Sequence, residues 1–95
     1  MNLISNQTKQ LYSALLSLKT EKECKKFLRD LLTESEIKEF ANRLTVAKML
    51  SEKTSYLEIE KQTGMSSTTI ARIQKWLTNG MGGYKLVIKR LYESK

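Results

Sequence analysis

The 95 residues include no proline, no histidine and one cysteine, and they carry a formal charge of +7. Without histidine the commonest general base and neutral metal ligand is missing, and one cysteine builds neither an internal disulfide nor a zinc site, so we expect no enzyme, no metal and no other cofactor. The lone cysteine suits a reducing cytoplasm, and because no secretory leader or membrane-length apolar run is visible, we expect a cytoplasmic protein that does not enter a membrane.

Helix starts are indicated by three capping boxes, in which a serine or threonine is followed three residues later by glutamate and the pair satisfies free amides of the first turn. They are Thr20 with Glu23, Thr33 with Glu36, and Ser55 with Glu58. Together with the apolar periodicity they predict an all-α fold of six helices in one domain, residues 1–95. The predicted helices cover residues 5–17, 21–31, 34–52, 56–63, 67–77 and 83–92.

The first three predicted helices each have an apolar face. The stripe of Leu11, Leu15 and Leu18 suits either an internal core or contact with a second subunit. The second helix is expected to bury Cys24, Phe27, Leu28 and Leu31. The third is expected to turn inward Ile37, Phe40, Ala41, Leu44, Ala47 and Leu50.

Residues 56–73 have the pattern of a short helix, a glycine turn and a second helix. Gly64 stands where the chain must turn, and glycine enters the left-handed region without a Cβ penalty. This layout predicts a helix-turn-helix, whose second helix enters the DNA major groove. The apolar positions that join the two helices are Ile59, Met65, Ile70 and Ile73.

The end of the chain is predicted to complete the core. Asn79-Gly80 ends the second helix of the pair. Trp76 is interpreted as a core residue or, alternatively, as the anchor of a dimer interface, where large aromatic residues are enriched. Core positions are expected at Ile59, Ile70, Ile73, Trp76 and Leu77, and the last helix has Tyr84, Val87, Ile88 and Leu91 on one side.

Candidate DNA-binding residues cluster after Gly64. One serine of the run Ser66-Ser67-Thr68-Thr69 is expected to cap the helix, and the other short hydroxyl side chains allow close approach to phosphate and thymine. Arg72 is placed to contact a guanine edge or a phosphate, with Lys75 beside the backbone. Tyr56 either donates to a phosphate or packs as a partly buried aromatic residue.

The positive charge is concentrated in the same region. From Met65 onward six bases stand against one acid, a net +5, whereas the preceding residues hold eleven bases and nine acids, a net +2. Such a patch attracts a polyanion and speeds encounter with it. Double-stranded DNA is therefore the expected partner.

Several segments resemble the Trp repressor family, most closely its YerC/YecD-type members. They are Leu32 to Glu36, Asn42-Arg43-Leu44, Met49-Leu50 and Ser55 to Arg72, and the likeness spans about Leu11 to Leu91. The resemblance implies an intertwined homodimer in which residues 1–53 form the dimerisation core, 55–77 the helix-turn-helix and 83–93 the C-terminal helix. It also implies recognition of a near-palindromic operator.

The same resemblance implies an effector pocket at Thr33, Arg43 and Arg72. The repressor has a glycine after the second arginine, where this chain has Ile73, whose branched side chain intrudes on the space for an indole. The segment from Arg43 to Ser55 is also one residue shorter than in the repressor. We therefore do not expect tryptophan as corepressor, and predict another small-molecule effector or none.

The sequence favours a homodimeric, sequence-specific DNA-binding transcriptional regulator, most specifically a repressor. One alternative is a replication-origin-type or non-specific DNA-binding module. Another is a protein-interaction module whose basic face binds an acidic protein surface.

Overall fold

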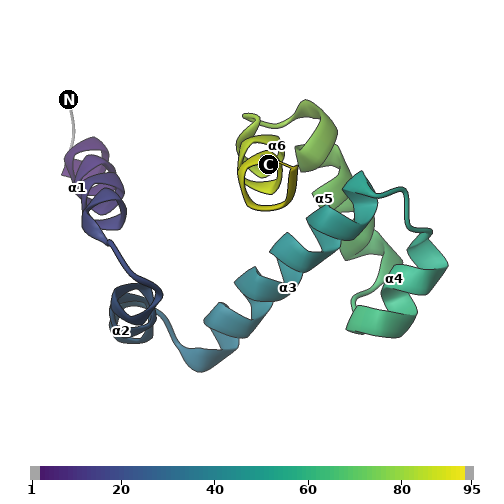
Figure 1. Cartoon of the computed structure of the whole chain (residues 1–95), viewed down its shortest axis with the longest axis horizontal. Helices are drawn as coiled ribbons and strands as arrows, with labels where there is room; N and C mark the ends of the chain where they lie inside the picture. The colour runs from purple at the N-terminus through teal and green to yellow at the C-terminus, as the bar shows by residue number, and fades with distance from the viewer. Residues whose placement is uncertain (1–2, 94–95) are drawn as a thin grey trace. The chain divides into compact units, whose positions relative to one another are not determined.

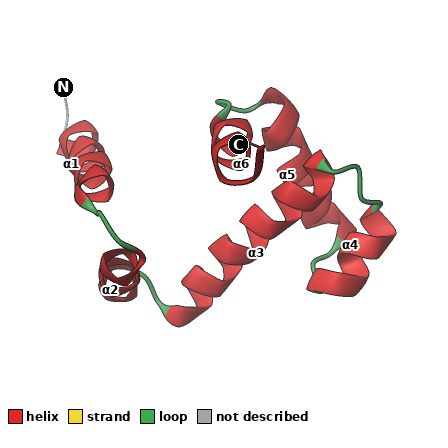
Figure 2. Ribbon diagram, viewed as in Figure 1, coloured by secondary structure: helices red, strands yellow, loops and turns green. Residues whose placement is uncertain are grey.

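The computed structural model describes residues 3–93, and every regular element in this range is a helix (Figures 1 and 2). The all-α fold of six helices is confirmed, and the predicted boundaries differ from the observed ones by a few residues. The elements are α1 (Leu3–Ser17), α2 (Glu21–Leu31), α3 (Glu34–Ser51), α4 (Tyr56–Thr63), α5 (Ser67–Asn79), α6 (Gly83–Ile88) and a π-helical segment, η1 (Lys89–Glu93).

Local capping explains where α2 and α3 begin. At α3 the capping box is complete: the Glu36 amide donates to Thr33 Oγ1 at 3.1 Å, and the Thr33 amide donates to Glu36 Oε1 at 2.9 Å. At α2 the Glu23 amide donates to Thr20 Oγ1, while the Glu23 carboxylate accepts from the Lys19 amide. Both helix starts are therefore fixed by hydrogen bonds within four residues of sequence.

The chain divides into two compact units, an N-terminal unit (Met1–Ile37) and a C-terminal unit (Lys38–Lys95). The described core lies in the C-terminal unit, where α3, α4, α5 and α6 each contribute buried side chains. Leu44, Met49, Met65 and Tyr84 pack against it as partly buried residues. The core consists of Val46, Ala47, Leu50, Ile59, Ile70, Ile73, Leu77 and Ile88.

The N-terminal unit contains no buried side chain among residues 5–37. The expectation that α2 buries its apolar face is wrong for the single chain. Leu31 is exposed, and the other three expected core residues of this helix are half-buried. An amphipathic helix needs a second apolar surface to cover its face, and α1 and α2 are not covered within this unit. The residues concerned are Cys24, Phe27, Leu28 and Leu31.

The inward face of α3 also differs from the prediction. Ala47 and Leu50 are buried as expected, but Phe40 is 49% exposed and Ala41 is exposed. Val46, which the prediction did not place in the core, is fully buried. Only the second half of α3 is covered by the helices after it, so its first half keeps an open apolar face.

The last predicted helix changes its winding partway. The chain follows an α-helix to Ile88 and continues as the π-helix η1, whose Tyr92 lies beside Lys48 of α3. There the Lys48 Nζ lies 4.6 Å from the centre of the Tyr92 ring and 2.7 Å from Glu52 Oε2. This cation–π contact joins the end of the chain to the helix that supports the core.

Candidate nucleic-acid interface

The helix-turn-helix begins with a capped α4. Ser55 is the N-cap, with its Oγ accepting from the Glu58 amide at 3.2 Å, while the Glu58 carboxylate accepts from Gln62. Of the two hydrogen bonds of the predicted capping box, the one to the serine hydroxyl is thus formed. Tyr56 follows as the first helical residue.

The turn after α4 has the predicted left-handed glycine. Gly64 has φ 77°, and its amide donates to Glu60 O at 2.9 Å. Thr63 completes the turn, because its Oγ1 donates to Ile59 O at 2.7 Å and accepts from the Met65 amide at 3.2 Å. The angle between α4 and α5 is therefore fixed by hydrogen bonds as well as by the apolar contact.

Helix α5 separates its core side from its outer side. Ile70, Ile73 and Leu77 are buried, as the sequence predicted. Residues on the opposite side, at 100° per residue, are exposed. They are Thr68, Ala71, Arg72, Lys75 and Asn79.

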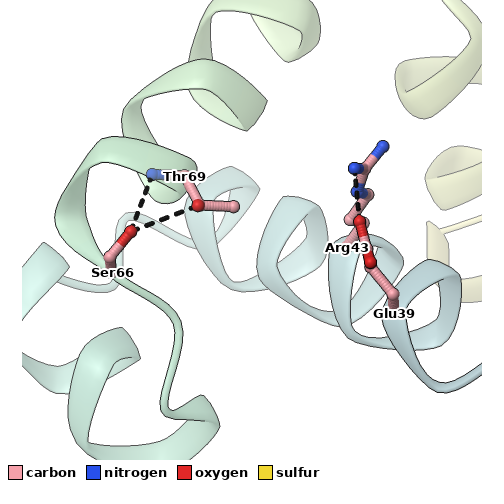
Figure 3. A network of polar contacts seen from close by, with 4 residues as sticks. All are labelled: Glu39, Arg43, Ser66 and Thr69. Atoms are coloured by element: carbon pink, nitrogen blue, oxygen red, sulfur yellow. Dashed lines mark hydrogen bonds and ion pairs between the residues drawn. The ribbon is translucent and has the colours of Figure 1, made fainter. Parts of the chain in front are cut away.

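Of the four consecutive hydroxyl residues, Ser66 is the cap. Its Oγ accepts from the Thr69 amide at 3.3 Å and donates to Thr69 Oγ1 at 3.2 Å (Figure 3). Ser67 and Thr68 are exposed, and within the described chain their hydroxyls have no intramolecular partner. These two are therefore the free hydroxyls at the N-terminus of α5, where amides and the helix dipole favour an anion.

The two cations of α5 are also accessible. Arg72 and Lys75 are exposed, and no carboxylate of the described chain pairs with either. Both lie on the side of α5 that faces away from the core. The outer side of α5 thus combines small hydroxyls with two free positive charges.

Tyr56 was predicted either to donate to a phosphate or to pack as a partly buried aromatic residue, and its position is compatible with both. Its side chain is 38% exposed at the start of α4 and lines a surface hollow beside Leu50 and Leu77. A partly buried ring holds the phenol in place, and its hydroxyl remains available to donate. Tyr56 stays a candidate for a phosphate contact.

The residues of the predicted effector pocket are engaged in different ways. Thr33 belongs to the capping box of α3, in the N-terminal unit. Arg43 Nη2 lies 2.5 Å from Glu39 Oε2 (Figure 3). Arg72 is exposed, and no polar contact joins it to Arg43 in the described chain. Thr33 and the two arginines belong to different units, and the effector pocket stays a prediction.

Arg43 instead lies near two aromatic rings. Its guanidinium carbon is 6.0 Å from the ring centre of Phe40 and 6.0 Å from that of Trp76. The contacts of Arg43 with Glu39 and Phe40 were visible in the sequence as spacings of four and three along a helix. The contact with Trp76 depends on how α5 packs beside α3, and no local signal could have found it.

Trp76 does not lie in the core. It is 42% exposed and borders a hollow of about 580 Å³ whose other walls include Leu44, Met81, Tyr84 and Val87. On α5 it lies about 60° around the helix from buried Ile73 and about 100° from buried Leu77, at the edge of the core side. The prediction of Trp76 as a core residue is wrong for the single chain, and the alternative of an interface anchor stays a prediction.

Two other features are absent from the described residues. No group of three or more His, Cys, Asp or Glu side chains is placed to hold a metal ion. No helix between residues 3 and 93 combines the length and apolarity needed to cross a bilayer.

The comparison with protein families agrees with this geometry. Residues 6–92 match the model of the family described as Trp repressor protein. YerC of Bacillus subtilis, described as uncharacterized, is 40% identical over 86 residues, which cover 90% of this chain and 83% of YerC.

Two crystal structures have the same fold. A TrpR-like protein from Eubacterium eligens superimposes with a TM-score of 0.88 at 41% identity, covering 93% of this chain and 91% of that one. A candidate Trp repressor from Staphylococcus aureus gives a TM-score of 0.85 at 33% identity, covering 96% and 95%. The chain belongs to the Trp repressor family, in its YerC subgroup.

Proposed function

We propose that this protein is a sequence-specific DNA-binding transcriptional regulator that acts as a homodimer on a near-palindromic operator, most specifically as a repressor. The observation that carries the proposal is the orientation of α5. Ile70 and Ile73 hold the helix on the core, and Arg72 and Lys75 are exposed on the other side. A helix presented in this way is suited to the major groove.

The contacts within this surface divide into two kinds. Ser67, Thr68 and Arg72 are proposed to approach base edges, where a bidentate arginine–guanine pair discriminates by about 1–3 kcal/mol. Tyr56 and Lys75 are proposed to hold phosphates, which sets the position of the protein but carries no sequence information. Ser66 is proposed to act through its amide at the helix N-terminus and Thr69 through its methyl group, because their hydroxyls are bonded to each other and the Thr69 amide is bonded to Ser66 Oγ.

A second copy of the chain is the proposed partner subunit. The apolar face of α1 and the exposed ring of Phe40 are large hydrophobic surfaces that water covers in the single chain. Two recognition helices related by a two-fold axis would read half-sites about one helical turn apart. The family assignment supports this arrangement.

We propose that tryptophan is not the effector. Ile73 is fully buried where a free space for an indole would be required, and Arg43 is already in contact with Glu39 and Trp76. A different small molecule, or none, would act on this regulator. A thermal-shift screen against amino acids tests this point, and a rise in melting temperature with tryptophan would contradict it.

The experiment for DNA binding is a selection of binding sequences from random duplexes, followed by titration of the best site. We expect a near-palindromic consensus. Arg72→Ala should weaken the best site by about 1–3 kcal/mol and relax one position of the consensus, while Lys75→Ala should weaken all duplexes alike.

The matched control for these variants is Lys22→Ala, which removes one exposed positive charge from α2. It should leave the sequence preference unchanged. Equal binding of every duplex, with no consensus, would argue against a specific regulator and for a non-specific DNA-binding module.

A further inference from the structure

A hollow with several polar side chains at its border lies on the C-terminal unit, beside α5. It has a volume of about 420 Å³ and is bordered by the end of α3, the start of α4, α5 and α6. Gln74 lines it, and this residue lies two positions, about 200°, around the helix from Arg72. On α5 the hollow therefore lies away from Arg72, and Tyr56 is the residue of the proposed DNA-contacting set that also lines it.

The lining of this hollow is rich in hydrogen-bond donors and contains no carboxylate. Leu50 and Leu77 form its apolar part. Two lysines contribute a charge of +2 that no acid among the lining residues offsets. The side chains able to donate to a ligand are Lys53, Thr54, Tyr56, Gln74 and Lys85.

These donors are free, whereas two other lining hydroxyls are not. Ser51 Oγ donates to Lys48 O at 2.6 Å, and Thr78 Oγ1 donates to Gln74 O at 3.0 Å. By contrast, the side chains of Lys53 and Lys85 form no hydrogen bond or ion pair within the described chain. Two lysines that border one hollow with no neighbouring acid give it a positive potential, which attracts an anion.

The backbone holds one of these lysines at the rim in an unusual conformation. Lys53 has φ 67°, the one positive value at a non-glycine residue among residues 3–93. The conformation is fixed by two bonds, from the Lys53 amide to Leu50 O and from the Thr54 amide to Met49 O, each 3.0 Å long. A glycine or asparagine is the usual residue in such a helix-ending position. A lysine is uncommon at that position.

We propose that this hollow binds a phosphate group between Lys53 and Lys85, with Tyr56 and Gln74 as additional donors. A phosphate offers acceptor oxygens on several sides, which suits donors that line one hollow from the turn after α3 and from α4, α5 and α6. The phosphate belongs either to the backbone of bound DNA or to a small phosphorylated ligand. The DNA source rests on the function proposed above, and the phosphate chemistry itself does not.

The first experiment measures phosphate binding to the full chain without DNA. Inorganic phosphate is titrated at constant ionic strength, and the amide resonances of residues 50–56 and the Gln74 side chain are followed by NMR. We expect a saturable shift that the double variant Lys53→Gln/Lys85→Gln abolishes. Absence of a saturable shift, or an unchanged shift in the double variant, would overturn the proposal.

Two further variants keep this test independent of folding. Lys53→Gly removes the charge where glycine suits the observed φ, so it is expected to fold and to weaken phosphate binding. Lys38→Gln removes an exposed lysine outside the hollow and is expected to leave the titration unchanged. If Lys38→Gln weakened binding as much as Lys53→Gly, general charge would explain the effect and the site would be rejected.

The second experiment identifies the source of the phosphate. If the DNA backbone occupies the hollow, saturating duplex suppresses the phosphate shifts, and the double variant lowers the slope of log affinity against log salt by about 2. If a small ligand is the source, the shifts persist with DNA bound and the salt slope is unchanged. Either result supports a phosphate site. A chain that binds no duplex refutes the proposed function, while the first titration still decides the hollow.

Discussion

The two units of this chain are both helical but are stabilised differently. In the C-terminal unit, Val46, Ile59, Ile70 and Ile73 are fully buried in a common core. In the N-terminal unit, no described side chain reaches that degree of burial, although its helices have clear apolar faces. Capping and periodicity therefore suffice to predict helices, whereas a core requires that apolar faces meet.

This difference has a direct consequence for stability. The C-terminal unit contains the apolar burial that an independent fold needs. The N-terminal unit exposes Leu11, Leu15 and Leu31, which only another surface can cover. We expect its contribution to stability to depend on protein concentration, because a second copy is the proposed cover.

The largest expected effect is in the core of the C-terminal unit. Ile70→Ala should lower the free energy of unfolding by about 2–5 kcal/mol, because it leaves a cavity at a residue with no exposed surface. Chemical denaturation measures this. Leu57→Ala, at a side chain that is 66% exposed, is the control and should change stability by about 0.5 kcal/mol or less. Similar losses in both variants would show that burial does not distinguish these positions.

The next effect concerns the apolar stripe of α1. The double variant Leu11→Ala/Leu15→Ala should raise the dimer dissociation constant tenfold or more, equivalent to about 1.4 kcal/mol for each factor of ten. Sedimentation over a range of concentrations measures it. Leu16→Ala, at an 85% exposed position outside the stripe, should leave the constant unchanged. A wild-type protein that stays monomeric at all concentrations would contradict the proposal that a second copy covers the N-terminal unit.

A smaller effect distinguishes local from cooperative stability. Thr33→Ala and Ser66→Ala each remove a helix cap and should cost about 1 kcal/mol. For Thr33→Ala, amide hydrogen exchange should accelerate about fivefold within the first turn of α3. The loss of stability should stay local there, because no buried core couples this turn to the rest of the chain. For Ser66→Ala the loss should appear in global unfolding. If exchange accelerated equally across both units in both variants, the N-terminal cap would not be more local in its effect than the cap of α5.

Ser67→Ala is the matched control for the second cap. Ser67 is exposed and forms no intramolecular hydrogen bond through its hydroxyl in the described chain. Its replacement should leave stability within about 0.5 kcal/mol. A loss as large as that of Ser66→Ala would mean that the cap is shared between the two serines.

The smallest effect is the pH dependence of the contact between α3 and η1. The hydrogen bond to Glu52 raises the pKa of Lys48 above its ordinary value of 10.5; burial acts against it, and the charges of Glu52 and Tyr92 add smaller effects in the raising direction. Because the pKa is raised on folding, this stabilisation is present below pH 10.5 and is lost as the pH rises through the folded pKa.

Melting curves of the wild type and Lys48→Met between pH 8 and pH 12 measure this contact. The difference in melting temperature should be small, constant up to about pH 10 and smaller above it. Lys38→Met, which removes an exposed lysine of the same helix, should show no such change with pH. A difference that grows above pH 10.5 would contradict the assigned direction.

Much of the candidate interface could be predicted because its determinants are local. Gly64 is the turn residue that a left-handed backbone needs, and Ser66 is followed by a helix in which Ile70 and Ile73 recur at helical spacing. These patterns also place Arg72 and Lys75 on the outer side. The sequence alone left open which serine is the cap, and the bond between Ser66 and Thr69 decides it.

The unpredicted features all depend on contacts between distant residues. The position of Trp76 over Arg43, the exposed first half of α3 and the hollow beside Lys53 follow from how α3, α5 and α6 pack. A single-chain pattern shows that a helix has an apolar face but not whether another helix covers it. For this reason Phe40 and Trp76 were expected inside and lie partly exposed.

The sequence by itself determined the helices, their caps, the glycine turn and the cationic side of α5, because hydrogen bonds and side-chain spacing within a few residues control them. The tertiary structure alone decided which apolar faces are covered, where Arg43 and Trp76 meet, and that Lys53 and Lys85 border one hollow. Those outcomes depend on the packing of helices far apart in the chain, and the free energy of that packing is not a property of any local segment.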